Sequence, residues 1–448
     1  MTDSPLRAAR EIVALIFGPV EGRHFAVRYW DGEVEWGGGS DAPPFTIVIA
    51  RRGALRRMLL PPSELSIVEA ILSGDVDIEG DAEQAIHLGD AVRERVGSPG
   101  ALARLVRLLL ALPRGAARDD VAAHRAAHVV DGAGSLHEPA RDQAAIRYHY
   151  DVGNDFYALW LDRAMVYSCA YFESGADPSA ELDDAQFAKL ELVCRKLRLR
   201  PGERLLDVGC GWGALVMHAV RHHGVSALGI TLSEAQAELA RRRIAEAGLA
   251  DRCRVEIRDY RALAGEPPFD KVASIGMVEH VGAGKLPAYF NAVYGALKAG
   301  GLFLNHGIVS VDAARPAGRW DWLESRLWKR DAFIDQYVFP DGRLTPFASV
   351  ITAAEAAGFE TRDVESLREH YTLTLRAWLT RLMRHRDEAI RLTDERLVRT
   401  WRLYMTASAH GFASGHINVL QTLLAKPLDG VSGLPLRRFG ALPPGDYR

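Results

Sequence analysis

The chain has 448 residues, which is enough for two domains or for one large domain with an extension. Its 48% hydrophobic and 25% charged residues are typical of a soluble globular protein with a large core, and its formal net charge of −3 gives no support to nucleic-acid binding. Its cysteines (Cys169, Cys194, Cys210 and Cys253) are scattered without a Cys-x-x-Cys pair, which argues against a disulfide framework or structural zinc and favours a reducing cytosol.

Membrane spans and export signals are not predicted. No apolar run approaches the roughly 20 residues that a membrane-spanning helix needs. The short apolar patch at 12–17 follows Glu11 and has no small-residue cleavage pattern, so a signal peptide is not expected. We therefore expect a cytoplasmic protein, with any membrane contact peripheral.

Residues 1–112 are predicted to form a small α+β domain. The alternating run 25–30, the turn at Asp31 and Gly32 and the returning run 33–36 indicate a hairpin. Further strands are expected at 45–50 and 75–78, and helices at 53–60, 63–72, 82–96 and 102–112. The last helix carries Arg104 and Arg107, and we favour a core-packing helix over a basic segment that meets anionic lipid head groups. No catalytic constellation is present, so packing, dimerisation or lipid-surface contact is the expected role.

The rest of the chain is predicted to be a linker and one larger domain. Residues 113–143 lack sustained periodicity and are interpreted as the linker. The domain 144–448 begins with strands at 203–208, 226–230, 253–257, 269–276 and 300–308, alternating with helices at 213–223, 233–247 and 285–298. An insertion at 311–341 and a helical region at 345–426 follow. The expected fold class is α/β, a doubly wound Rossmann-like sheet with a small N-terminal α+β domain and helical C-terminal additions.

A glycine-rich turn joins the first predicted strand to the next helix. In Asp207-Val208-Gly209-Cys210-Gly211-Trp212-Gly213 the glycines allow a tight turn and let a ligand approach bare amides at a helix N-terminus. Dinucleotide enzymes have a related turn, but their second strand usually ends in an acidic residue, whereas this one ends in Thr231. The turn resembles the S-adenosylmethionine turn of class I methyltransferases. We therefore favour a methyltransferase and keep an NAD oxidoreductase as an alternative.

Polar side chains follow the carboxyl ends of the other predicted strands, where α/β sheets place their sites. They are Thr231 and Gln236 after the second strand, Asp259 and Tyr260 after the third, Glu279 and His280 after the fourth, and His306 after the fifth. Asp259 and Tyr260 suit the edge and face of an adenine, and a carboxylate and an imidazole on neighbouring strands can share a polar pocket. Each residue alone could be a helix cap or a loop residue.

No metal site is expected, because no pair of ligand-type residues has helical or hairpin spacing. His222 and His223 are interpreted as an exposed helix end. Aromatic and polar residues interleave at 147–157 and 167–172, which indicates a lid over an apolar ligand. Core packing is the alternative for these aromatic residues.

Seven motifs together make a more specific resemblance, which covers about residues 147–426. They are Tyr150-Asp151-Val152-Gly153-Asn154-Asp155-Phe156-Tyr157, Tyr167-Ser168-Cys169-Ala170-Tyr171-Phe172, Leu206 to Gly213, Gly229-Ile230-Thr231-Leu232-Ser233 with Gln236, Asp259-Tyr260-Arg261, Met277-Val278-Glu279-His280-Val281-Gly282 and Tyr337-Val338-Phe339-Pro340-Asp341-Gly342. In this order and spacing the chain resembles the cyclopropane-fatty-acid synthase family, which includes the mycolic-acid cyclopropane synthases. The match of the N-terminal domain is looser.

The resemblance implies a catalytic domain that transfers the methyl group of S-adenosylmethionine onto a cis double bond of a phospholipid acyl chain. The resulting carbocation loses a proton to a bound bicarbonate ion, and a cyclopropane forms. The implied bicarbonate site consists of Cys169, Glu279, His306, the backbone of Ile308, and Tyr371. The implied cofactor contacts are Tyr167, Ser168, Asp207, Gly209, Cys210, Gly211, Gly213, Thr231, Gln236, Asp259 and Tyr260. It also implies peripheral contact with the inner face of the membrane and a homodimer.

The chain departs from the family pattern near the implied acyl pocket. Asn305-His306-Gly307-Ile308 replaces the common Leu-His-Thr-Ile stretch, Val278 replaces a Phe, and the insertion at 311–341 is longer than in the compact synthases. These differences affect the expected product more than the methyl transfer. A hydride shift before proton loss would give a methylene- or methyl-branched chain, which is the first alternative. A non-catalytic lipid-binding protein is the remote one.

Overall fold

The structure is a computed structural model that describes residues 4–38, 42–86, 88, 98–114, 138–150, 152–311, 333–340, 342 and 344–436. Much of the predicted linker at 113–143 and of the insertion at 311–341 therefore lies outside the described residues, as do Asp151 and Asp341. The part of the linker that is described includes the start of a helix at Pro139.

A sheet of order β2-β1-β3-β4 organises the described N-terminal unit. β1 (Ala26–Arg28) pairs antiparallel with β2 (Val34–Glu35), which confirms the predicted hairpin, and parallel with β3 (Phe45–Ile49). β3 pairs antiparallel with β4 (Val76–Gly80). The helical segments are α1 (Ser4–Phe17), η1 (Val20–Gly22), α2 (Ala54–Leu59), α3 (Glu64–Leu72), α4 (Ala82–Ile86) and α6 (Pro99–Ala111).

Two helices complete the core of this unit. α1 was not predicted, and it buries Ile12 and Val13. α6 begins after Ser98, whose hydroxyl accepts a hydrogen bond from the amide of Ala101 at 3.2 Å. Its residues Leu105 and Leu109 are buried, whereas Arg104 and Arg107 are exposed. The core-packing interpretation of this helix is therefore confirmed.

The larger unit is built on a sheet that contains eight strands among the described residues, in the order β11-β12-β9-β8-β5-β6-β7 with β10 beside β9. The strands are β5 (Arg204–Val208), β6 (Ser226–Thr231), β7 (Cys253–Ile257), β8 (Phe269–Ile275), β9 (Leu297–Ser310), β10 (Thr345–Pro346), β11 (Glu360–Ser366) and β12 (Ile417–Ala425). β5 to β9 run parallel to one another, and each coincides with a predicted strand. The predicted and observed strands agree because most of them are short apolar runs that end at glycine or polar residues, a pattern typical of buried strands.

Helices cover both faces of this sheet, so the doubly wound α/β fold is confirmed. The helical segments of the unit are α9 (Pro139–Tyr150), α10 (Asn154–Ala158), α11 (Pro178–Lys196), α12 (Ala214–His223), α13 (Glu234–Glu246), η2 (Tyr260–Ala262), α14 (Val278–Val281), η3 (Ala283–Lys285), α15 (Leu286–Ala296), η4 (Ile334–Val338), α17 (Phe347–Ala356), α18 (Arg368–Arg384), α19 (Arg386–Leu392) and α20 (Glu395–Ala413). Buried side chains of α11, α12 and α13 pack on one face, and those of α15 and α17 pack on the other.

The expectation of a purely helical C-terminal region is wrong. β11 and β12 lie within it, and β12 pairs antiparallel with both β9 and β11. The sheet is thereby extended beyond β9, and residues of β12 are placed beside His306. This extension is the part of the fold that matters most for the site.

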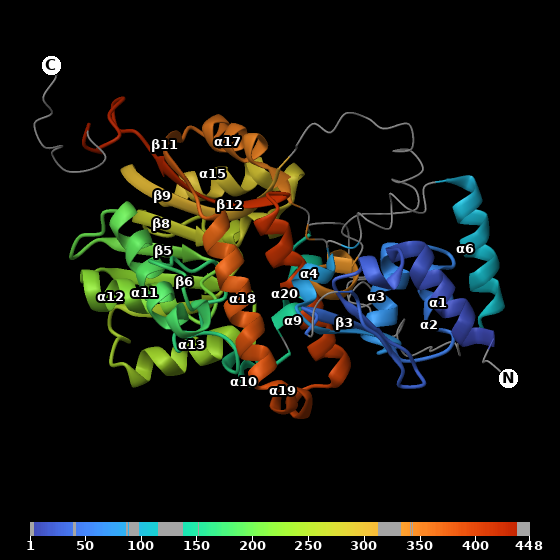
Figure 1. Ribbon diagram of the computed structural model, residues 1–448. Coiled ribbons are helices and arrows are strands. Elements are labelled where there is room, and N and C mark those ends of the chain that lie inside the picture. The colour runs from blue at the N-terminus through green and yellow to red at the C-terminus, as the bar shows by residue number, and fades with distance from the viewer. Residues whose placement is uncertain are drawn as a thin grey trace, which may run out of the picture.

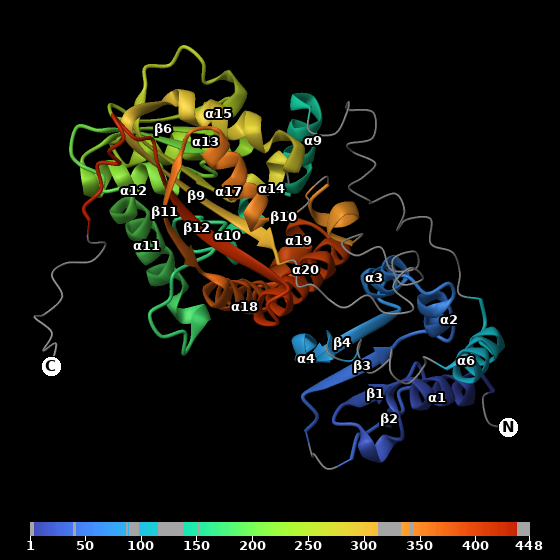
Figure 2. The ribbon, with the colours of Figure 1, turned by 90° about the horizontal axis from the view of Figure 1, so that it is seen from above.

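The N-terminal unit packs against helices of the C-terminal region, as the two views in Figures 1 and 2 show. Asp77 of β4 forms ion pairs with Arg399 and Arg402 of α20, both at 3.0 Å. Glu83 of α4 pairs with Arg376 of α18 at 2.7 Å. Within the described segments, no helix combines the length and apolar character that crossing a bilayer requires.

Candidate active site

The glycine turn after β5 has the conformation that its sequence predicts. Gly209, Gly211 and Gly213 have φ values of 83°, 53° and 83°, a region that residues with a side chain rarely adopt. The amides of Gly209 and Cys210 donate to the carbonyl of Ile230, and that of Gly213 donates to the carbonyl of Cys210. These three amides are therefore used to close the turn on the sheet, and the expectation of bare amides at them is wrong.

A cavity opens beside this turn and gathers most of the predicted cofactor residues. Those that line it are Tyr167, Ser168, Asp207, Gly209, Cys210, Gly211, Thr231, Gln236, Asp259 and Tyr260. Gly213 is not in the wall, because it packs toward Ala240 of α13. Sequence reasoning missed Lys189 and Met277 as parts of the wall.

Lys189 and Asp207 are buried charges in this wall. Burial raises the pKa of Asp207 to about 7, against the attraction of Lys189. Burial lowers the pKa of Lys189 to about 8, and its Nζ donates to Ser168 Oγ at 2.8 Å. Asp207 Oδ1 is buried without a hydrogen-bond partner, so the cavity presents an unpaired acceptor to a ligand. Lys189 lies among the buried, mostly apolar positions of the helix at 178–196. A lysine at such a position was the signal in the sequence that could have identified it as a functional residue.

The residues predicted to contact adenine are more engaged with the protein than expected. Both oxygens of Asp259 accept hydrogen bonds from the Arg261 side chain, at 2.8 and 2.6 Å. The Arg261 guanidinium also lies 5.3 Å from the ring centre of Tyr260, and Tyr289 meets that ring edge-on. Thr231 Oγ1 donates to Gln236 Oε1 at 2.8 Å. Arg261 therefore positions the Asp259–Tyr260 wall of the cavity.

Glu279 and Ile308 meet next to the cavity. Glu279 Oε1 accepts a hydrogen bond from the Ile308 amide at 2.9 Å, and Oε2 is buried without a hydrogen-bond partner. Burial raises the pKa of Glu279 to about 7, and the hydrogen bond from Ile308 opposes this rise. The amide expected to hold bicarbonate thus supports Glu279 instead.

The tautomer of His306 is fixed by residues of α11 and β12. Lys196 Nζ, which can only donate, bonds Gln421 Oε1 at 2.7 Å, so the Gln421 amide nitrogen faces His306 Nδ1 at 3.2 Å. Nδ1 is then an acceptor, and the proton of the neutral ring lies on Nε2. Burial lowers the pKa of His306 to about 3, and the charges of Lys189 and Lys196 add to this effect. His306 is therefore a neutral Nε2–H donor.

Cys169 and Tyr371 meet at the carbonyl of Leu367. The Cys169 thiol lies 3.6 Å from this oxygen and 3.3 Å from the carbonyl of Ala170, and the Tyr371 amide bonds the Leu367 oxygen at 3.0 Å. Burial raises the pKa of the thiol, so Cys169 is a neutral donor.

None of the five predicted anion-site residues lines the cavity, although Cys169 and Glu279 lie next to residues that do. Ser168 lines the cavity but Cys169 does not, and Met277 and His280 line it but Glu279 does not. Cys169, Tyr371 and Ile308 belong to or pack against one hydrophobic cluster. The structure thus pairs Glu279 with Ile308, and it brings the Cys169 thiol and the Tyr371 amide to the same carbonyl oxygen.

The predicted aromatic lid is largely a packed core. Phe156, Tyr157 and Phe172 are each at most 5% exposed, as the core-packing alternative expects. Asn154 Oδ1 accepts a hydrogen bond from Trp212 Nε1 at 2.7 Å, which ties this segment to the glycine turn. His222 is exposed as expected, but His223 is not a free helix end, because its Nε2 bonds Glu191 at 3.0 Å.

Comparisons with known proteins agree with this geometry. The sequence model of the mycolic acid cyclopropane synthetase family matches residues 137–422, and a domain of unknown function matches residues 14–93. A probable fatty acid methyltransferase of Pseudomonas putida is 39% identical over 416 residues, which cover 92% of this chain and 94% of that protein. Cyclopropane mycolic acid synthase 1 of Mycobacterium tuberculosis is 36% identical over 278 residues, 62% of this chain and 95% of that protein.

Solved structures are similar over the larger unit. The mycolic acid cyclopropane synthase CmaA1, complexed with SAH and CTAB, is 35% identical with a TM-score of 0.58, covering 63% of this chain and 97% of that one. The cyclopropane synthase MmaA2 from Mycobacterium tuberculosis is 32% identical with a TM-score of 0.57, covering 65% of this chain and 99% of that one.

Proposed function

The chain belongs to the mycolic acid cyclopropane synthetase family and is an S-adenosylmethionine-dependent methyltransferase of lipid chains; from this premise we propose that it methylates the cis double bond of an unsaturated phospholipid acyl chain and closes a cyclopropane ring, with bicarbonate as the proton acceptor. The observation that carries the proposal is Glu279. Its carboxyl group is fixed by the Ile308 amide, and its second oxygen is buried without a partner, next to residues that line the cofactor cavity.

The residues of the cavity fit S-adenosylmethionine. When bound, this cofactor supplies an electrophilic methyl group on a positively charged sulfur. Asp207 Oδ1 offers a buried acceptor to it, and the absent side chain of Gly211 leaves open space at the turn. Gln186 Nε2 donates to the carbonyl of Ser168 at 2.8 Å, so Ser168 is positioned through its backbone by Gln186 and through its hydroxyl by Lys189.

The reaction requires a dry site with a base. An alkene is a weak nucleophile, so its π-bond must be aligned with the methyl group in the absence of water. The aromatic cluster beside the turn, which includes Tyr157, Trp212 and Trp378, supplies apolar surroundings. Attack leaves a carbocation on the acyl chain, which has to lose a proton to a nearby base before the ring closes.

The donors and acceptors of the predicted anion-site residues suit a bicarbonate ion, which carries one O–H group and several acceptor oxygens. Ionised Glu279 would accept from that O–H, and the Nε2–H of His306 would donate to the ion. Cys169 and Tyr371 would add a thiol and a phenol as donors. An ion without a proton would instead face the negative charge of Glu279.

A phospholipid substrate also implies contact with a membrane surface. Acyl chains lie within the bilayer, so we propose that the protein binds peripherally to the inner face of the membrane. Sedimentation with phospholipid vesicles would measure this binding. The homodimer stays a prediction.

The test uses S-adenosylmethionine labelled in its methyl group and vesicles of dioleoyl phospholipid. We expect label in the lipid with wild-type protein, near-complete loss in Glu279→Gln, and full activity in the matched control Glu256→Gln, which changes a partly exposed carboxylate on β7. Activity should also fall when bicarbonate is removed and return when it is added.

The product and the controls separate the alternatives. Nuclear magnetic resonance of the labelled lipid distinguishes a cyclopropane from a methylene branch, which would indicate the hydride-shift alternative. No labelled product with several unsaturated phospholipids would contradict the proposal. Absence of S-adenosylmethionine binding in calorimetry would instead indicate a non-catalytic lipid-binding protein.

A further inference from the structure

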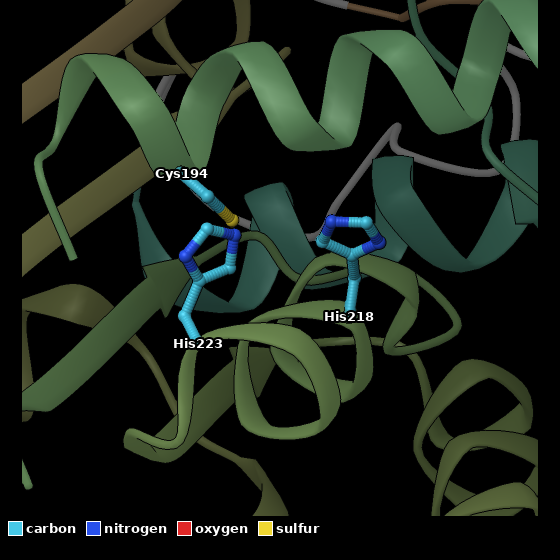
Figure 3. A group of neighbouring side chains, drawn as sticks. All are labelled: Cys194, His218 and His223. Atoms are coloured by element: carbon cyan, nitrogen blue, oxygen red, sulfur yellow. The ribbon is translucent and has the colours of Figure 1, made fainter. Parts of the chain in front are cut away.

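A second group of polar side chains lies between α11 and α12, away from the bicarbonate residues. Figure 3 shows His218 and His223 on α12 and Cys194 on α11 as neighbours, with the ring of His223 next to the thiol and the ring of His218 to one side. The thiol sulfur and one nitrogen of each ring lie within 4.8 Å of one another. Glu191 lies one turn before Cys194 on α11, a pair with helical spacing that the sequence prediction overlooked. Its Oε2 lies 3.2 Å from His218 Nε2 and 3.0 Å from His223 Nε2.

The group is shielded from solvent but not sealed. Cys194 is fully buried, and the side chains of His218 and His223 are 5% and 17% exposed. The Glu191 side chain is 33% exposed, which leaves a path from the surface. Both imidazole rings contact the same carboxylate oxygen of Glu191, so three groups that can bind a metal ion converge on one point.

The spacing of these side chains approaches that of the ligands around a small metal ion. Zinc binds nitrogen and oxygen at about 2.0–2.2 Å and sulfur at about 2.3 Å, so neighbouring ligands of a tetrahedral site lie roughly 3.3–3.7 Å apart. The contacts of Glu191 Oε2 with both rings are already close to this separation. The thiol sulfur and the ring nitrogens lie within 4.8 Å of one another, which is wider than this separation, so metal binding would draw these side chains together.

We propose that Glu191, Cys194, His218 and His223 bind one divalent transition-metal ion of the zinc class. A thiolate and two imidazoles select borderline-soft ions over magnesium or calcium, which prefer oxygen ligands. Binding through the thiolate would release the proton of the Cys194 thiol.

The ion would join the two helices that form one side of the cofactor cavity. α11 contributes Lys189 and Leu190 to the cavity wall, and α12 begins directly after Gly213 and contributes Ala214 and Leu215. A metal between the helices therefore stabilises the cofactor site without touching the reacting atoms. The inference does not depend on the lipid substrate.

The test is a cobalt titration of the full-length protein after treatment with a chelator. We expect a thiolate-to-cobalt charge-transfer absorption and the visible bands of tetrahedral cobalt, at one ion per chain, and displacement of cobalt by zinc. Cys194→Ser should abolish the charge-transfer absorption, and His223→Gln should weaken binding at least tenfold.

Two matched variants control for unspecific effects. His222→Gln removes the exposed neighbouring imidazole, and Cys253→Ser removes another buried thiol; both should bind cobalt like the wild type. S-adenosylmethionine binding by each variant confirms that it is folded. No charge-transfer absorption in the wild type, or an unchanged absorption in Cys194→Ser, would overturn the proposal.

Discussion

At the scale of single residues, the buried carboxyl group of Asp207 couples stability to pH. Burial raises its pKa to about 7. A raised carboxyl pKa means that the folded protein binds the proton more tightly than the unfolded chain does. The contribution of Asp207 to the unfolding free energy is fully present below the unfolded pKa of about 4 and is lost as the pH rises to about 7.

We therefore expect Asp207→Asn to change the pH dependence of the unfolding free energy. When the pH is raised from 4 to 8, the unfolding free energy of the variant should rise relative to that of the wild type by on the order of 3 kcal/mol, because asparagine cannot ionise. Urea unfolding at both pH values measures this difference. Asp270→Asn is the control, because the Lys298 ammonium and the Arg204 amide lower the pKa of that carboxyl despite its partial burial, so its difference should run in the opposite direction. Parallel curves for Asp207→Asn and wild type would contradict the prediction.

Gln421 is predicted to position His306 for the proposed reaction. Gln421→Leu removes the donor to Nδ1, so the ring can adopt either tautomer, whereas Gln421→Glu supplies an acceptor and favours the proton on Nδ1. We expect kcat to fall about tenfold or more in Gln421→Leu and further in Gln421→Glu, with little change in KM for S-adenosylmethionine.

Nitrogen NMR of histidine-labelled protein provides an independent measurement of this effect. The spectrum reports the protonated nitrogen of His306 directly, and His306→Gln identifies its signals. An Nε2–H tautomer that persists in Gln421→Glu would refute the positioning role even if activity fell.

These residues also show what sequence alone could predict. Glu279 and Cys169 lie in motifs, so the prediction that they belong to the site followed from the family resemblance. Lys196 and Gln421 are 225 residues apart and meet only because β12 pairs with β9. A contact that depends on an unpredicted strand pairing leaves no local pattern in the sequence.

At the scale of elements, β11 and β12, two of the strands that prediction missed, differ from those that it found. β5 and β6 are buried apolar runs, which are typical of central parallel strands. β11 is largely polar and no residue of it is buried, as expected of a strand at the edge of the sheet. β12 is a long apolar run, and the spacing of its hydrophobic residues does not distinguish a buried strand from a buried helix.

The two departures from the family pattern beside Glu279 are sterically linked. A β-carbon at Gly307 of β9 would lie 2.1 Å from Cγ1 of Val278 on α14. The branch of Val278 therefore occupies the space that a side chain at position 307 would need. Glycine and valine fit together here as an alternative to the threonine and phenylalanine of the family pattern.

Gly307→Ala should consequently destabilise the protein by about 1–3 kcal/mol, because the extra methyl group overfills a packed site. Val278→Ala in the same chain removes the clashing atom. The double variant should therefore be more stable than the two single effects predict, by at least about 0.5 kcal/mol. Chemical denaturation of all four proteins measures this coupling, and strictly additive effects would show that the two positions do not clash.

At the scale of the whole molecule, charged contacts join the N-terminal unit to the catalytic unit. Asp77 faces Arg399 and Arg402, and Tyr337 donates to Glu69 at 3.1 Å. The side chains of Asp77, Arg399 and Arg402 are between 18% and 23% exposed, so their charges are only partly screened by solvent. The interface also has an apolar part, because Val68 and Leu72 of α3 belong to the same hydrophobic cluster as Trp401 and Tyr404 of α20. These contacts join segments that are far apart in the chain and leave no local pattern, which is why the sequence predicted two units but not how they pack.

Asp77→Ala should weaken this interface. It leaves two arginine side chains without one of their acceptors, at a cost of about 1–3 kcal/mol. We expect calorimetry to resolve a separate, earlier unfolding transition of the N-terminal unit, and 1 M salt to produce a similar separation in the wild type. Glu79→Ala is the matched control, because Glu79 lies on the same strand but pairs with Arg28 inside the unit. If Asp77→Ala unfolds in the same way as Glu79→Ala, the ion pairs on α20 do not couple the two units, and the contacts of α3 and α4 must do so instead.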